Sequence, residues 1–173
     1  DLRRSRGLGD VYKRQERVHL DRGLVKSLIK TIPSEITLHA RNPEKTVALG
    51  GRQSIFIPMT GAPYLRDLED VRRSPTLDDL ATFHKLAHML PAMHSSAHHI
   101  VEPMDHPISH RHLRITHSSM LYSDKTFMGM TTSGQNAEDV LDMCAILFGE
   151  EYLETHAVVT GNCNGNSPLV WDE

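Results

Sequence analysis

The chain has 173 residues, of which 39% are hydrophobic, 24% are charged and only 5% are aromatic, with a formal net charge of −3. This composition excludes collagen-like and disordered proteins, and the net charge gives no general case for nucleic-acid binding. The two cysteines cannot form a disulfide scaffold, and no apolar run is long enough for a transmembrane helix. We therefore expect a cytoplasmic protein without membrane contact.

Residues 1–15 differ in character from the rest of the chain. They carry five of the nineteen basic residues and lack both a helix-capping signal and the apolar stretch of a signal peptide. The run from Asp10 to Gln15 is what a common transposon-derived sequencing adapter encodes when it is read in frame. We expect a disordered adapter scar here, with a natural basic arm as the alternative, and a chain cut from a longer gene that continues beyond Glu173.

Residues 16–52 predict a small α+β lead-in made of an N-terminal helix and a β-hairpin. A short strand is expected at 17–20, followed by a helix at 22–30 that Pro33 ends. The hairpin strands are expected at 36–40 and 46–49, on either side of a turn-type tetrapeptide. The apolar residues on one face of the helix are Leu24, Leu28 and Ile32.

From residue 53 onward, short β-prone runs alternate with helical patterns. The expected strands are 54–58, 98–101, 126–130 and 157–160. The last two steps from strand to strand are about thirty residues long, the size of a right-handed βαβ unit. This alternation predicts a parallel α/β architecture.

Three helices are expected between these strands. Residues 76–90 begin with the capping-box pair Thr76 and Asp79, and a weaker pattern covers 109–121. The most regular pattern follows Asn136, which we expect to cap it together with Asp139, and Gly149 ends it. The side chains of this helix expected to face the core are Val140, Leu141, Cys144, Leu147 and Phe148.

Two parallel architectures fit this alternation. A doubly wound nucleotide-binding sheet requires G-x-G-x-x-G after its first strand, and residues 59–64 lack it. A barrel instead collects polar residues at the carboxyl ends of successive strands, as this sequence does. We therefore predict an α/β fold in which residues 53–173 are the first half of a (β/α)8 TIM-type barrel, about four βα units truncated at the C-terminus, and keep the doubly wound sheet as the alternative.

The polar residues after the predicted strands are the candidate ligand contacts. Glu102 follows the second strand, where a poorly hydrated carboxylate favours a cationic ligand, with an internal salt bridge as the alternative. Asparagine amides orient a polar ligand without adding charge, although they also stabilise turns. The full candidate set is Thr60, Glu102, Thr131, Asn162, Asn164 and Asn166.

The twelve histidines raise the question of a metal site. His84 and His88 have the i, i+4 spacing of a zinc-protease helix, but Lys85 occupies the position of the required glutamate. The histidines from His94 to His117 have no cysteine or carboxylate at ligand spacing, so we expect solvated or capping side chains. We predict no metal ligands and keep a metal-dependent barrel hydrolase as an alternative.

Two long runs closely resemble the trimethylamine:corrinoid methyltransferase family. They extend from Met128 to Tyr152 and from Asn162 to Val170. Residues 36–43 and 75–80 are also similar to that family. The resemblance therefore covers nearly everything outside the expected scar.

The resemblance implies an eight-fold α/β barrel that transfers a methyl group from a methylated amine to the Co(I) corrinoid of a separate corrinoid protein, so the chain itself binds no cofactor. Glu102 is then expected to contact the cation, and the threonines and asparagines to orient the polar tail of the substrate. The expected partners are the corrinoid protein, the small amine and, in a homo-oligomer, further copies of the chain.

Relatives that act on trimethylamine carry pyrrolysine in a later strand, which would lie beyond Glu173. Both trimethylamine and a quaternary amine such as glycine betaine therefore remain open as substrates, and no catalytic residue is assigned. The 173-residue piece alone is expected to be poorly soluble and inactive. A non-catalytic half-barrel module that docks a corrinoid protein is the alternative from another functional class.

Overall fold

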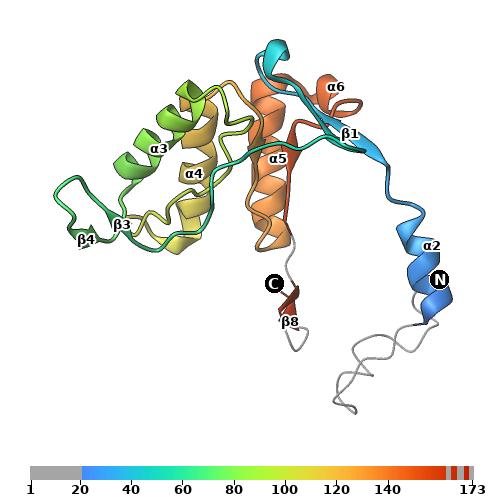
Figure 1. Cartoon of the computed structure of the whole chain (residues 1–173), viewed down its shortest axis with the longest axis horizontal. Helices are drawn as coiled ribbons and strands as arrows, with labels where there is room; N and C mark the ends of the chain where they lie inside the picture. Colours follow the sequence, from blue (N-terminus) through green and yellow to red (C-terminus); the bar gives the residue numbers. More distant parts are fainter. Residues whose placement is uncertain (1–20, 163–164, 167–169, 172–173) are drawn as a thin grey trace. The chain divides into compact units, whose positions relative to one another are not determined.

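The computed structural model describes residues 21–162 and the backbone of residues 165–166 and 170–171 (Figure 1). The predictions on residues 1–15, on the strand at 17–20 and on Asn164 lie outside the described residues. The described residues divide into two compact units, with the boundary between Ser34 and Glu35.

The first unit contains helix α2, Arg22–Ile29, close to its predicted bounds. The helix begins at Asp21, whose carboxylate accepts a hydrogen bond from the backbone N–H of Leu24 at 2.8 Å. Its apolar face is exposed: Leu28 is 53% accessible and Ile32, just beyond the helix, is 66% accessible. The sequence thus predicted the helix and its stripe.

The second unit opens with the predicted hairpin. Strands β1, Glu35–Leu38, and β2, Val47–Gly50, pair antiparallel with Leu38 opposite Val47. A short 3-10 helix, η1, Pro43–Lys45, forms the connection, and the side chain of Asn42 caps it. The hairpin prediction is confirmed with its strands shifted by about one residue.

Four extended segments follow, at residues 54–62, 94–102, 126–131 and 157–162, and neighbouring segments pair in parallel in chain order. The first meets the second where Ala62 bridges Val101, and the second meets the third where Ser95 bridges Thr126. The third and fourth contain strands β5, Phe127–Met128, and β6, Val159–Thr160, which also pair in parallel.

The first predicted strand, 54–58, is wrong in its position. Residues 54–58 form no regular strand, although the carbonyl of Phe56 accepts a hydrogen bond from the N–H of His94 at 2.8 Å. The shortest backbone hydrogen bond between the first and second segments lies further along the chain, where the N–H of Gly61 donates to the carbonyl of His99 at 2.7 Å. The sequence between the first segment and the next helix also forms an unpredicted hairpin of β3, Leu65–Arg66, and β4, Arg72–Arg73.

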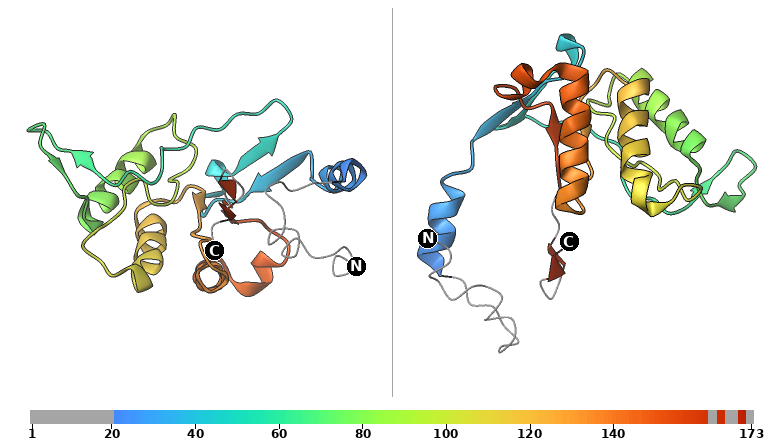
Figure 2. Two further views of the ribbon diagram at one scale, coloured as in Figure 1. Left: turned by 90° about the horizontal axis from the view of Figure 1, so that it is seen from below. Right: turned by 180° about the vertical axis from the view of Figure 1, so that it is seen from behind.

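The helices connect these segments in turn and lie side by side (Figures 1 and 2). Helix α3, Leu77–Met89, leads to the second segment, and α4, Ile108–Tyr122, to the third. Helices α5, Gly134–Phe148, and α6, Glu150–Leu153, lead to the fourth. Beyond it, β7, Gly165–Asn166, and β8, Val170–Trp171, pair antiparallel. No helix in the described part of the chain is both long and apolar enough to cross a membrane.

The core lies between the helices and the parallel segments in two apolar clusters. One joins α3 and α4 to the second segment, and the other joins α4 and α5 to the third and fourth. Cys144 is fully buried, and burial raises the pKa of its thiol to about 11, as a core cysteine requires. Leu141 is 52% exposed, so its predicted place in the core is wrong. The buried cluster members are Leu80, Val101 and Ile115 in the first cluster, and Met120, Phe127, Val140, Cys144 and Val158 in the second.

The helix ends confirm two capping predictions and correct one. Thr76 and Asp79 form the complete capping box of α3, and Gly149, with φ of +92°, ends α5. The predicted cap of α5 at Asn136 is wrong, because Ser133 is the N-cap and accepts from the N–H of Asn136 at 3.2 Å. Asp139 instead contacts His112 on α4.

Asp79 is expected to give α3 a pH-dependent contribution to stability. Arg73 donates to both of its carboxylate oxygens at 2.6 and 2.7 Å, and this contact and the Thr76 N–H hold the pKa of Asp79 well below its ordinary value of 3.8. Asp79→Asn should lower the free energy of unfolding by about 1 kcal/mol at neutral pH. Because the folded pKa is depressed, this contribution is complete above pH 3.8 and is lost as the pH falls towards the folded value.

Urea unfolding at a series of pH values checks this. The matched control is Asp78→Asn, an exposed carboxylate in the same helical turn with no side-chain partner among the described residues. A difference between wild type and Asp79→Asn that stays constant down to pH 2 would contradict the account.

Candidate functional site

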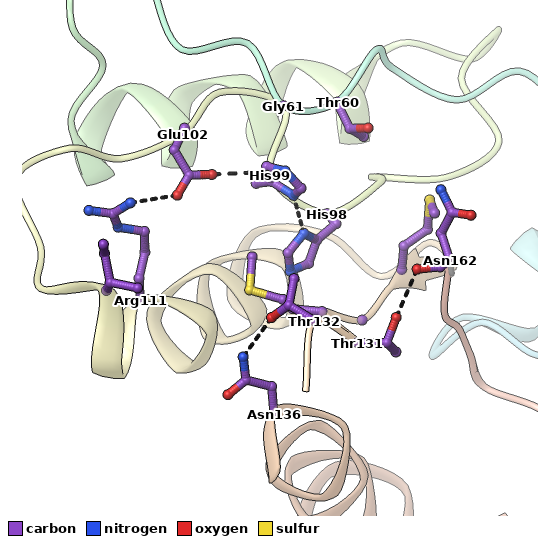
Figure 3. A pocket seen from close by; sticks show the side chains of 14 residues that line it. Thr60, Gly61, His98, His99, Glu102, Arg111, Thr131, Thr132, Asn136 and Asn162 are labelled. Carbon is purple, nitrogen blue, oxygen red and sulfur yellow. Dashed lines mark hydrogen bonds and ion pairs between the residues drawn. The ribbon is translucent and has the colours of Figure 1, made fainter. Parts of the chain in front are cut away.

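A cavity of about 620 Å³ lies at the carboxyl ends of the four parallel segments (Figure 3). Helix α4 contributes residues from its first turn, and α5 contributes Asn136. Nine of the fourteen lining residues have polar or charged side chains, and the other five are glycine, methionine or isoleucine. The lining residues are Thr60, Gly61, His98, His99, Glu102, Ile108, Arg111, Met128, Gly129, Met130, Thr131, Thr132, Asn136 and Asn162.

Most of the predicted site residues meet in this cavity. Thr60, Glu102, Thr131 and Asn162 line it, one from each of the four segment ends. Asn164 lies outside the described residues, and Asn166 is placed in β7 by its backbone alone. The role of all six as substrate contacts stays a prediction.

Glu102 takes part in an ion pair within the cavity. Its Oε1 accepts a hydrogen bond from Nη1 of Arg111 at 2.7 Å, and its Oε2 lies 3.8 Å from Nε2 of His99. The Arg111 guanidinium also donates twice to the carbonyl of His106, at 3.1 Å and 2.8 Å. The internal salt bridge that was the alternative prediction for Glu102 therefore forms. A ligand in the cavity meets a carboxylate that is already paired with a guanidinium.

His98 and His99 form a neutral pair beside Glu102. Their rings lie edge to face with centroids 4.5 Å apart, and the two Nδ1 atoms contact each other. Burial, and then repulsion from the rings of His99, His84 and His112 when these are protonated, lower the pKa of His98 to about 3. Burial also lowers the pKa of His99, against the opposing effect of Glu102. Neither ring carries charge at neutral pH, so the pair adds polar surface without adding a cation.

The expectation that these histidines are solvated is wrong for His98, which is 3% exposed. Its Nε2 is buried without a hydrogen-bond partner among the described residues, although the side chain lines the cavity. His112 is equally buried, and its Nε2 lies 2.6 Å from Oδ2 of Asp139, which joins α4 to α5 and lowers the pKa of that carboxyl. The sequence alone does not show which of these histidines are buried, because their burial depends on how α3, α4 and α5 pack.

His84 supports the segment that carries His98. Its Nε2 lies 2.7 Å from the carbonyl of His98, so this nitrogen carries the proton, and its Nδ1 accepts from the hydroxyl of Ser118 at 2.9 Å. Both nitrogens of the zinc-protease-like His84 thus have protein partners. In residues 21–162, no group of three or more histidine, cysteine or carboxylate side chains is close enough to hold a metal ion.

Glycines allow the third and fourth segments to approach closely at the cavity. A Cβ atom on Gly161 would lie 2.6 Å from Cγ2 of Thr131, closer than such atoms approach. This close approach lets Oγ1 of Thr131 donate to the carbonyl of Asn162 at 3.0 Å (Figure 3). The hydroxyl of Thr131 is therefore held by the neighbouring segment.

Arg111, the partner of Glu102, was not predicted from the sequence as a site residue. It lies nine residues after Glu102 in the first turn of α4, a position that reaches the carboxyl ends of parallel strands as their loops do. Four further lining residues were not predicted either: His98, His99, Thr132 and Asn136. The sequence signal for Arg111 and Asn136 is their place in the first turn of the helix that follows a strand end.

Comparison with known proteins identifies the family. The family model for trimethylamine methyltransferase matches residues 3–173, starting inside the segment whose adapter origin stays a prediction. The chain is 40% identical over 171 residues to a glycine betaine methyltransferase of Desulfitobacterium hafniense strain Y51, covering 95% of this chain and 36% of that protein. It is 25% identical over 171 residues to trimethylamine methyltransferase MttB of D. hafniense strain DSM 10664 / DCB-2, covering 95% of this chain and 34% of that protein.

The chain spans about a third of the length of these curated relatives. The family match extends over both long runs that carried the resemblance, Met128 to Tyr152 and Asn162 to Val170. It also includes the parallel segments whose ends line the cavity. The chain therefore belongs to the trimethylamine methyltransferase family.

Proposed function

We propose that this chain is part of an enzyme that takes one N-methyl group from a methylated amine and transfers it to the Co(I) corrinoid of a partner protein. Family membership and the methyltransferase names of both relatives support the reaction class. The observation that carries the proposal is the cavity at the segment ends, which holds Glu102 beside neutral His98 and His99.

The same proposal includes a (β/α)8 barrel, of which residues 53–173 are the first half. Parallel pairing of the four segments in chain order supports it, because a doubly wound sheet reverses its strand order at the switch point where ligands bind. The position of the cavity at the carboxyl ends of the segments also supports it. The part of the relatives that this chain does not cover would supply the other half.

The residues of the cavity suit a reaction that removes positive charge. When a quaternary ammonium loses a methyl group, the C–N bond breaks, its electron pair stays on nitrogen, and the methyl group passes to Co(I), which supplies the electrons and becomes Co(III). Glu102 faces the charged reactant, but its pairing with Arg111 moderates the attraction. Binding of the ground state is then not stronger than binding of the transition state requires.

The remaining polar groups would position the substrate. The hydroxyl groups of Thr60 and Thr131 and the amide of Asn162 come from three different segment ends and line one cavity. Correct placement of the reacting methyl group is the main task of the protein in such a reaction, since the corrinoid supplies the nucleophile. The higher identity to the glycine betaine enzyme than to the trimethylamine enzyme favours a quaternary amine as substrate.

Incubation of the full-length protein with cob(I)alamin and single amines tests the proposal. Loss of the Co(I) absorbance is expected with a methylated amine, and faster with glycine betaine than with trimethylamine. Glycine, which has no N-methyl group, is the control. If no methylated amine consumes Co(I) faster than glycine does, the proposed function is wrong.

A further inference from the structure

The ionisable groups of the cavity are balanced in charge. Glu102 contributes one negative charge and Arg111 one positive charge, while His98 and His99 are neutral. The described lining residues include no phenylalanine, tyrosine or tryptophan, whose faces commonly bind quaternary ammonium groups. A ligand with a positive charge alone therefore meets neither an excess of negative charge nor an aromatic cage.

Arg111 retains hydrogen-bonding capacity directed at no described residue. A guanidinium has five N–H groups, and three of its hydrogen bonds are to Glu102 and the carbonyl of His106. The side chain is only 12% exposed, so its remaining donors have limited access to water. A carboxylate is the group that matches a guanidinium most closely in geometry and charge.

The start of α4 adds to this preference. Ile108, in its first turn, lines the same cavity as Arg111, and the N-cap residue Pro107 provides no side-chain hydrogen bond to the first turn. The N–H of His110 donates to the carbonyl of Pro107 at 3.2 Å, and the positive end of the dipole of this fifteen-residue helix favours negative charge nearby. The guanidinium and the helix end thus favour the same kind of ligand group.

Building on the proposed function, we infer that the cavity binds its methylated amine as a zwitterion, with Arg111 binding the carboxylate and Glu102 facing the ammonium group. In such a molecule a short carbon linker separates the two charges. The charged groups of Arg111 and Glu102 are also close together, 2.7 Å apart, so one small ligand can contact both. Arg111 is then the residue that determines specificity. A methylated cation without a carboxylate leaves the guanidinium uncompensated and binds more weakly.

Calorimetric binding to the full-length protein, without corrinoid, tests this inference with glycine betaine and choline as probes. In Arg111→Met the Kd for glycine betaine should rise about 10- to 100-fold, because a charge-assisted hydrogen-bond pair is lost. The Kd for choline should stay the same or fall, since Glu102 no longer shares its charge. Arg111→Lys should recover part of the betaine affinity because it keeps the charge but not the fork.

The matched control is Arg114→Met, an exposed arginine on the same helix, which should leave both Kd values unchanged. Unchanged betaine binding in Arg111→Met, an equal loss for betaine and choline, or absence of betaine binding in the wild type would each overturn the inference. Binding that depends on Arg111 in a protein that transfers no methyl group would contradict the proposed function and leave the inference standing. Methyl transfer from betaine that Arg111→Met does not affect would do the reverse.

Discussion

Glu102→Gln in the full-length protein is expected to lower kcat/KM for methyl transfer by about 100-fold. The substitution removes the carboxylate proposed to face the ammonium group. It also removes the negative charge that lies 2.7 Å from Arg111, whose side chain is only 12% exposed. Removal of one member of a largely buried charge pair typically costs about 2–5 kcal/mol, and a 100-fold rate effect requires about 2.7 kcal/mol. Steady-state kinetics with a methylated amine and reduced corrinoid measures the effect.

Glu138→Gln is the matched control, because Glu138 is an exposed carboxylate on α5. It should leave kcat/KM within about two-fold of wild type, as surface substitutions usually do. Binding of the corrinoid protein should be measured alongside activity. If Glu102→Gln keeps its amine demethylation but loses that binding, Glu102 belongs to a docking surface and the non-catalytic alternative gains support.

Lys125→Met should lower the free energy of unfolding by about 3 kcal/mol. Lys125 is 7% exposed, and its Nζ donates to three backbone carbonyls at the end of α3 and just beyond it. These carbonyls belong to Ala87, Leu90 and Met93, at 2.8, 2.8 and 2.7 Å. Methionine fills a similar volume but donates no hydrogen bond, so the end of the helix loses its cap.

Denaturant unfolding of Lys125→Met against Lys85→Met tests this contribution. Lys85 is an exposed lysine of α3 whose Nζ lies 4.4 Å from the ring centre of Tyr122, so its removal should cost less than about 1 kcal/mol. Equal stability of the two variants would show that the contacts of Lys125 with the carbonyls contribute nothing measurable. Lys125 also lies two residues before β5, so its loss should disturb the segment that carries Thr131.

Local signals made several elements predictable from the sequence. The Thr76 and Asp79 pair specifies the start of α3 because both partners lie within one helical turn. Gly149 ends α5 for an equally local reason, since φ of +92° suits a residue without a side chain. Strand ends could likewise be located closely enough to bring Thr60, Glu102, Thr131 and Asn162 into one cavity.

Features that depend on packing between distant segments could not be predicted in this way. His98 is buried because α3 and α4 pack over its segment, and the local pattern of histidines around it indicates a polar surface. The ion pair of Glu102 with Arg111 depends on how α4 leaves the second segment. The start of α5 at Ser133 was missed because Asn136, three residues later, is an equally good capping residue by type.

Transfer of a ¹³C-labelled methyl group tests the central claim most directly. The full-length protein would receive glycine betaine labelled in its N-methyl groups together with Co(I) corrinoid, and NMR would follow the label. The account predicts one labelled methyl group on cobalt for each molecule of labelled dimethylglycine formed, and none without the protein. Label that appears as methanol, or that stays on the amine while the corrinoid is unmethylated, would contradict it.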